Sequence, residues 1–489
     1  MVGVPSRSKA CSTCKRRRKG CDLVRPACSQ CRALGIDCGG YDRDLIFVVS
    51  TLDDRPAGRS YRVECNVPPP GQELTIQTGP QLASLTRAAY ESHYAGRFWE
   101  AYMPRGRPIP PELVTSYICN WTIVAQRLYD VDETVRFAFL ANCLCHATRG
   151  LDGEGGGAPW MEVEGRCMYG RALASLKRSL SRNPESNVAA VIAAKLLSTF
   201  EMFFGTEKKA FLDSRGWEQH NAGETALLVS RGPSGCSRGS DHAIFIDDRV
   251  DLLLSAIKAR KKSPLSTDEW KTKPWSETPR NLKDILVDVL IHMPGLLEEF
   301  DRMRLGQDEN KKTRRRQRLL TRCNIYQRDL QEWKSIVCAA GEMDVSCLGR
   351  AEATQENVAI VQGLALYWTT CILLYTTQRL ASGPEALLPA HTDPGIYIRK
   401  ILDTVPLLLS PKAGLYGQHA AILPLAVAVQ YTLALESSIG DLQERLMAVL
   451  EQPSCALIRS FLVGNGMSSS ENWDLEAMRD RAREWAGTP

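Results

Sequence analysis

Histidine is scarce in this chain, with seven residues among 489. None of the seven lies in an H-x-x-x-H spacing, and the sequence has no Gly-rich phosphate loop and no nucleophile elbow. These absences argue against a zinc hydrolase, a nucleotide-binding enzyme and a serine hydrolase. We therefore expect a protein that is not an enzyme.

The sequence also lacks the usual signs of secretion or membrane insertion. Residues 1–10 are polar and basic, without a following apolar segment. The apolar stretches at 188–204 and 420–429 are interrupted by Lys195 and Glu201 or are too short to span a bilayer. We expect a soluble intracellular protein with no membrane partner, in a reducing compartment where clustered cysteines rarely form disulfides.

Cysteine and positive charge are concentrated at the N-terminus. Six of the 17 cysteines lie within residues 11–38. Residues 1–50 hold ten Lys or Arg against four Asp or Glu, a net charge of +6, whereas the whole chain carries +5. A polyanion-binding surface is therefore expected at this end only.

The cysteine spacing is an internal duplication, C-x2-C-x6-C followed after six residues by the same pattern. The six residues are Cys11, Cys14, Cys21, Cys28, Cys31 and Cys38. A zinc ion takes four ligands, so two ions need eight bonds, which six cysteines supply if two of them bridge both ions. The bridging pair should be equivalent in the two halves, and Cys11 and Cys28 are the obvious candidates, although the spacing alone leaves other equivalent pairs open. We predict two bound zinc ions.

These spacings resemble those of the fungal binuclear zinc cluster (Zn2Cys6) transcription factors. The basic residues after the second cysteine, Asp22 after the third and Pro26 before the fourth add to the resemblance. The resemblance implies that Cys11 and Cys28 bridge the two ions and that Pro26 lies in the loop joining two short helices. It also implies recognition of a CGG-type triplet in double-stranded DNA.

The predicted DNA-binding residues form the run between the second and third cysteines, which we expect to be helical: Lys15, Arg16, Arg17, Arg18 and Lys19. The resemblance places Arg17 and Arg18 nearest the base edges, and arginine can pair bidentately with guanine. The other three are assigned to phosphates or to support of the cluster. Relatives often carry lysine at the positions of Arg18 and Gly20, so the division of base reading between the two arginines stays open.

The remainder of the chain has the apolar spacing of helices from about residue 81 onward, without an alternating strand pattern. We predict a small zinc-stapled two-helix module at residues 8–42, a linker without a coiled coil at 43–80, and a large all-α domain of a dozen or more helices at 81–489. Residues 215–303 resemble the fungal-specific transcription factor domain, chiefly through Trp217, His220, Gly223 and residues 231–233.

Together these features predict a nuclear, sequence-specific regulator of RNA polymerase II transcription that works with the transcription machinery. Any homodimer would form through residues 81–489. The KRRRK run can also serve as a nuclear import signal, and the basic run 311–318 is interpreted as a solvated face or a second such signal. Two alternatives stay open: an enzyme with zinc as a structural staple, and a co-regulator whose cluster no longer binds DNA.

Overall fold

The structure is a computed structural model. It describes residues 10–24, 27–39, 80–104, 120–148, 159–182, 187–205, 215–339, 349–383, 386–434 and 440–464. The chain divides into two units, Met1–Leu82 and Ala83–Pro489. Pro26 and the predicted linker, except for Pro80, lie outside the described residues. Within these ranges all regular structure is helical, which confirms the predicted fold class of a small cysteine-rich module followed by an all-α domain.

The first unit contains two short helices, α1 (Ser12–Arg17) and α2 (Ser29–Ala33). Each starts directly after the leading cysteine of its half. The Cys28 sulfur accepts a hydrogen bond from the Cys31 amide at 3.4 Å, and Cys11 accepts one from Cys14 at 3.3 Å. In each helix a sulfur thus takes the place of the usual side-chain oxygen cap.

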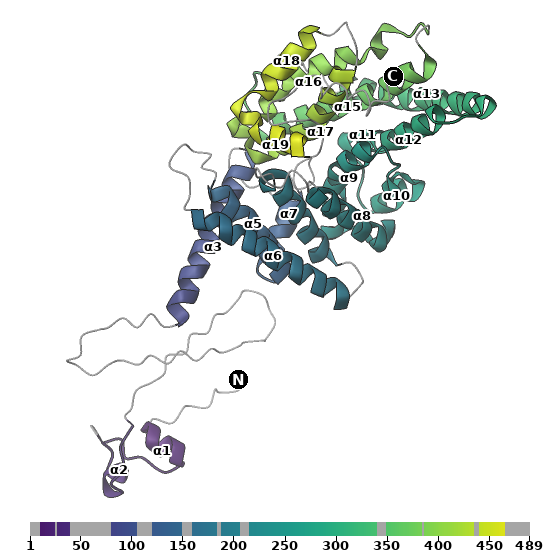
Figure 1. The fold of residues 1–489 in the computed structure, drawn as a ribbon. Coiled ribbons are helices and arrows are strands. Elements are labelled where there is room, and N and C mark those ends of the chain that lie inside the picture. Colours follow the sequence, from purple (N-terminus) through teal and green to yellow (C-terminus); the bar gives the residue numbers. More distant parts are fainter. Residues whose placement is uncertain are drawn as a thin grey trace. The chain divides into compact units, whose positions relative to one another are not determined.

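The second unit is a bundle of helices stacked on one another (Figure 1). Its α-helices, together with α3, which begins just before it, are α3 (Pro80–Tyr102), α4 (Asn120–Tyr129), α5 (Glu133–Thr148), α6 (Pro159–Arg182), α7 (Val188–Phe204), α8 (Arg215–Gly235), α9 (Gly239–Ala259), α10 (Asp268–Thr272), α11 (Leu282–Leu290), α12 (Met293–Arg304), α13 (Glu309–Ala339), α15 (Gln355–Ser382), α16 (Pro394–Leu408), α17 (Gly414–Ala434), α18 (Gly440–Leu450) and α19 (Ala456–Gly464). Short 3-10 helices lie at Pro264–Ser266, Lys273–Trp275, Ala390–Thr392, Pro411–Ala413 and Pro453–Cys455.

One continuous apolar core runs through the second unit. Its central helix, α15, packs against α11, α12, α13, α16 and α17. By length and composition α15 could cross a membrane, but 78% of its most apolar stretch is buried in the domain. Its apolar composition is therefore explained by burial in the core. The sequence analysis did not single out this helix.

Helix α8 is interrupted near its C-terminal end. Gly232 has φ 71° and ψ 163°, and Pro233 follows it. A positive φ is readily adopted only by glycine, and proline cannot continue the hydrogen-bond ladder of the preceding turn. The Arg231-Gly232-Pro233 sequence therefore ends one helical segment and starts another.

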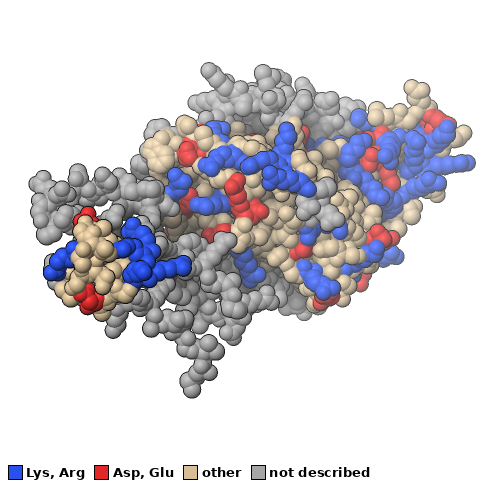
Figure 2. Space-filling view, turned by 90° about the horizontal axis from the view of Figure 1, so that it is seen from below, with Lys and Arg blue, Asp and Glu red and all other residues tan. Residues whose placement is uncertain are grey.

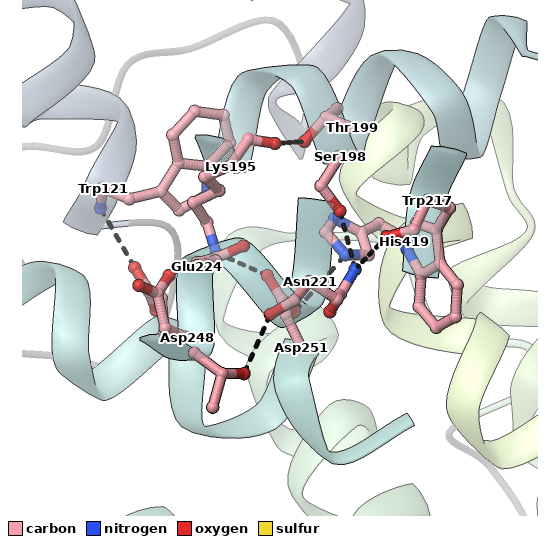
Figure 3. A network of polar contacts seen from close by, with 12 residues as sticks. Trp121, Lys195, Ser198, Thr199, Trp217, Asn221, Glu224, Asp248, Asp251 and His419 are labelled. Atoms are coloured by element: carbon pink, nitrogen blue, oxygen red, sulfur yellow. Dashed lines mark hydrogen bonds and ion pairs between the residues drawn. The ribbon is translucent and has the colours of Figure 1, made fainter. Parts of the chain in front are cut away.

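A buried ionic network joins α7, α8, α9 and α17 (Figure 3). The Lys195 ammonium lies 2.7 Å from Asp248 Oδ1, 2.5 Å from Asp251 Oδ2 and 3.9 Å from Glu224 Oε1. His419 Nε2 lies 3.4 Å from Asp251 Oδ1. Burial, and after it repulsion from Asp248, raises the pKa of Glu224 well above its usual value. Lys195 thus holds together carboxylates from two helices that would otherwise repel one another in the core.

Two small cavities border this network. One, lined in part by Trp217 and Asn221, has a volume of about 10 Å³, the room of a single water molecule. The other, lined in part by Asp247 and Tyr416, has about 40 Å³. A drug-sized ligand needs several hundred Å³. The Trp217 helix borders a cavity of the size of a water molecule, and His220 on the same helix lies 2.7 Å from the Tyr169 hydroxyl.

Candidate metal centre and nucleic-acid interface

The six N-terminal cysteines come together at the centre of the first unit. Their sulfur atoms form two groups of four, and within each group all atoms lie within 4.8 Å of one another. The first group is Cys11, Cys14, Cys21 and Cys28, and the second is Cys11, Cys28, Cys31 and Cys38. The two groups share Cys11 and Cys28. This is the arrangement that two four-coordinate ions with two bridging thiolates require.

The distances between sulfur atoms fit zinc. Cys11 and Cys28 Sγ are 3.8 Å apart, Cys14 and Cys28 are 3.7 Å apart, and Cys11 and Cys31 are 3.9 Å apart. Ligands about 2.3 Å from a tetrahedral ion lie about 3.8 Å from one another. The residues present therefore match both the donor type and the spacing of a zinc-thiolate centre.

The cysteine side chains of the cluster are packed so closely that the neutral thiol is favoured over the thiolate unless a cation is bound. Burial, followed by hydrogen bonds among neighbouring thiols, raises the pKa of Cys31 to about 12 and also raises the pKa of Cys14. Bound metal ions reverse this preference because they coordinate the deprotonated sulfur. Backbone amides assist, since the Cys11 amide donates to Cys21 Sγ at 3.4 Å and the Cys28 amide to Cys38 Sγ at 3.5 Å.

Polar contacts hold the two halves of the unit together around the sulfur atoms. Ser12 Oγ donates to the Gly39 carbonyl at 2.5 Å, and Thr13 Oγ1 donates to the Asp37 carbonyl at 3.0 Å. Both carboxylate oxygens of Asp22 accept from the Ser29 amide at 3.1 Å. The sequence analysis noted Asp22 as part of the family pattern but did not foresee this clamp between the first half and α2.

The basic run lies on the surface, and it is helical only in part. The sequence analysis expected Lys15 to Lys19 on one helical segment, but α1 ends at Arg17. Arg18 has φ 52°, in the left-handed region, and the Lys19 amide donates to the Cys14 carbonyl at 3.1 Å. This turn ends the helix, because the third cysteine must fold back to the cluster. The expectation was therefore wrong for Arg18 and Lys19.

All four side chains of Arg16–Lys19 are exposed. In Figure 2 the larger group of lysine and arginine side chains lies on one side of the module, and a smaller group lies on the opposite side. Arg16 and Arg17 lie on the last turn of α1, whereas Arg18 and Lys19 lie on the turn that follows it. The four cations therefore point in several directions.

The two halves of the duplicated module have similar backbone conformations but expose different side chains. Ile36 donates its amide to the Cys31 carbonyl at 3.1 Å, as Lys19 does to Cys14. Gly35, with φ 62°, occupies the position equivalent to Arg18. Where the first half carries cations, the second exposes Leu34 (53% exposed) and Ile36 (38%). The second half, residues 28–38, holds one cation, Arg32, and one acid, Asp37, so the net positive charge that suits a polyanion lies in the first half.

Residues 9–45 match the model of the fungal Zn(2)-Cys(6) binuclear cluster domain. The N-terminal module is a Zn(2)-Cys(6) binuclear cluster domain. Such a domain binds two zinc ions through six cysteines, so the predicted cluster domain and the predicted cofactor are both confirmed.

Three curated fungal proteins share parts of the sequence. Transcription factor FUP7 of Fusarium proliferatum is 54% identical over 35 residues, which is 7% of this chain and 14% of that protein. Pestheic acid cluster transcriptional regulator 3 of Pestalotiopsis fici is 35% identical over 108 residues, 18% of each chain. Sterol uptake control protein 2 of Candida albicans is 46% identical over 44 residues, 9% of this chain and 6% of that protein.

The matched segments thus span less than a fifth of each relative's length. No solved structure matches the chain. The match to the cluster domain stops at residue 45. The resemblance of residues 215–303 to the fungal-specific transcription factor domain accordingly stays a prediction.

Proposed function

We propose that this chain is a sequence-specific DNA-binding transcription regulator, not an enzyme, which acts in the nucleus on transcription by RNA polymerase II. The observation that carries the proposal is the pair of four-sulfur groups sharing Cys11 and Cys28, with the exposed cations of Arg16–Lys19 next to them. The relatives named as a transcription factor and a transcriptional regulator support it.

We assign one zinc ion to Cys11, Cys14, Cys21 and Cys28, and the other to Cys11, Cys28, Cys31 and Cys38. When bound, the two ions supply folding free energy, roughly 10 to 16 kcal/mol for a small zinc module. All eight bonds come from cysteine, so neither ion keeps an open position for a substrate. This favours a structural role for the metal and argues against the enzyme alternative.

The segment next to the cluster has two tasks. Six thiolates and two divalent ions leave the cluster negative, so nearby cations are needed before the module can approach DNA. Arg17 and Arg18 are then assigned to base edges of a CGG-type triplet, because arginine pairs bidentately with guanine O6 and N7. Arg16 and Lys19 are assigned to phosphates, and so is Lys15, whose side chain lies outside the described residues.

The turn at Arg18 bears on how base reading is divided between Arg17 and Arg18, which the sequence left open. Arg17 is the last residue of α1, whereas Arg18 starts the turn that returns to Cys21. A residue on the helix end enters a groove along with the helix. We therefore assign the larger share of base reading to Arg17.

The test is selection of bound duplexes from random DNA by the full-length, zinc-loaded protein. We expect enrichment of a CGG-like triplet; one copy would indicate a monomer, and paired copies at fixed spacing a dimer formed through the helical domain. Recovery of no shared sequence would contradict the proposal.

Variants then test the assigned residues on the selected site. Arg17→Ala should reduce discrimination at one guanine by about 1 to 3 kcal/mol, roughly 5- to 150-fold, with a smaller effect for Arg18→Ala. Arg182→Ala, an exposed arginine on α6, is the control and should leave discrimination unchanged. If Arg17→Ala and Arg18→Ala together leave affinity unchanged, the co-regulator alternative holds instead.

A further inference from the structure

A second concentration of positive charge lies on the first half of α13. Residues 309–322, called here the α13 basic segment, contain seven Lys or Arg and one acidic residue, Glu309. The rest of the helix, residues 323–339, is balanced, with Arg328 and Lys334 against Asp329 and Glu332. In Figure 1 the α13 end of the second unit projects from the bundle, and Figure 2 shows basic side chains gathered at that end.

The other side of α13 is firmly packed, which fixes the direction in which the basic segment faces. Leu319, Cys323 and Leu330 are fully buried. Trp333 stacks on Tyr367 with ring centroids 5.1 Å apart, and its indole donates to the Leu282 carbonyl at 2.7 Å. The exposed cations are therefore held on a rigid surface.

The four arginines in the middle of the segment, Arg314 to Arg316 and Arg318, have no carboxylate within ion-pair distance among the residues that the structure describes. Arg315 donates to the Arg302 carbonyl at 3.0 Å, and Arg316 donates to the Ser382 carbonyl. Arg314 and Arg318, one turn apart on the same face, are exposed. The other three cations, at the ends of the segment, are paired: Lys311 lies 3.2 Å from Asp308, Lys312 lies 3.3 Å from Glu309, and Arg322 pairs with Glu299.

This distribution is unfavourable for an isolated helix. Like charges four residues apart on a helix repel and destabilise it, whereas opposite charges at that spacing stabilise it. The segment contains four like-charged pairs at that spacing: Lys311 with Arg315, Lys312 with Arg316, Arg314 with Arg318, and Arg318 with Arg322. A polyanion would remove this repulsion. A merely solvated face would gain from the mixed charges found in the second half of the same helix.

We propose that the α13 basic segment binds the phosphate backbone of double-stranded DNA that flanks the site read by the cluster domain. This inference rests on the proposed function. Guanidinium groups, of which the segment has five, match phosphate geometry bidentately. The 40 residues between the described parts of the two units, 40–79, can extend to at most about 145 Å, so both surfaces are able to reach one duplex.

DNA fits this surface better than a receptor that reads an extended basic peptide. The segment is helical throughout, and the buried residues on its other side would have to leave the core before it could extend. A DNA duplex can bind the segment in its helical conformation. The second import signal considered in the sequence analysis is thus the less favoured interpretation.

The experiment measures binding of the full-length, zinc-loaded protein to two duplexes over a range of salt concentrations. Both contain the selected site, and only one has long flanks. Arg314→Gln with Arg318→Gln should reduce the slope of log K against log[salt] by about 0.9 for each lost phosphate contact, hence by about 1.8, on the long duplex only. The matched control is Arg328→Gln with Lys334→Gln, two exposed cations of the same helix, and should change nothing.

Loss of folding is excluded as a cause by thermal unfolding, because removing like-charge repulsion should leave the variant at least as stable as the parent. An unchanged slope on the long duplex overturns the inference while leaving the proposed function intact. Impaired nuclear accumulation with an unchanged slope also overturns it, in favour of a transport receptor. Loss of triplet selection in the Arg17→Ala protein tests the proposed function separately.

Discussion

The two units of this chain are stabilised in opposite ways. The cluster domain has only cysteines in its buried core, and it leaves Leu23, Val24, Leu34 and Ile36 exposed. The helical unit has a continuous apolar core from α3 to α19 and even buries an ionic network within it. A chain segment of fewer than about 40 residues cannot bury enough apolar surface to fold alone, whereas several hundred residues can. Metal coordination therefore replaces the hydrophobic core in one unit only.

The largest expected effect is removal of zinc. Chelation should unfold the cluster domain, because about 10 to 16 kcal/mol of folding free energy is lost, and leave the helical unit folded. Circular dichroism should retain nearly all helical signal while DNA binding is abolished. Binding that persists after complete removal of zinc, verified by metal analysis, would contradict the assigned role of the six cysteines.

The next effect concerns the buried network of the helical unit. Lys195→Ala removes the ammonium group that pairs with Asp248 and Asp251, so the unit should lose about 3 to 5 kcal/mol of stability in urea unfolding. Lys273→Ala removes an exposed partner of Glu269 and should cost under about 1 kcal/mol. Equal costs for the two variants would show that burial of the network contributes nothing. Affinity for a short duplex should be unchanged in both.

A third test uses pH. Desolvation lowers the pKa of His220 to about 4, below the usual value of 6.5. Between these values the unfolded chain binds the proton and the folded chain does not, so the contribution of His220 is present above about pH 6.5 and is lost as the pH falls toward 4. The full difference is about 3 kcal/mol.

His220→Gln should flatten the dependence of helical-unit stability on pH over this window, as measured by urea unfolding followed by circular dichroism. His93→Gln, at an exposed histidine of α3, is the control and should leave the dependence as it is. A parent-like slope in the His220 variant would show that burial of this imidazole has no effect on stability.

The smallest effect compares equivalent backbone positions of the cluster domain. Arg18 adopts a left-handed conformation that disfavours a side chain, so Arg18→Gly should stabilise the zinc-loaded domain by about 0.5 to 1 kcal/mol while weakening DNA binding. Gly35→Ala should destabilise the domain by a similar amount, since nothing crowds its Cβ and only the backbone conformation opposes it. Midpoints of unfolding against chelator concentration measure both. Shifts of the same sign in the two variants would rule out backbone strain as the cause.

Much of the helical unit could be predicted from apolar periodicity. The apolar stretch 188–204, within the region that was expected to be helical, coincides with α7. The end of α1 at Arg17 was missed, because the basic run has no glycine or proline to mark a helix end. What terminates that helix is the return of Cys21 to the metal centre, a constraint from outside the run.

The candidate metal site was predicted almost entirely by sequence, whereas the buried network was not. Cysteine spacing and duplication predict two ions that share one equivalent pair of cysteines. They leave the identity of that pair open, and the structure shows two four-sulfur groups that share Cys11 and Cys28. Lys195 looked like an interruption of an apolar helix. Its partners lie more than fifty residues away on α9, and no local pattern announces them.

The sequence by itself determined the metal stoichiometry, the location of the basic run and the all-helical class, because these depend on short-range spacing and composition. Only the tertiary structure decided which charges are buried and which are exposed. Lys195 and the arginines of α13 are both cations on long helices, yet one is enclosed by carboxylates of α8 and α9 while the others face solvent. The difference arises from which helices pack against each helix face. Helix packing minimises the exposed apolar surface of the whole unit, so it cannot be read from any one segment.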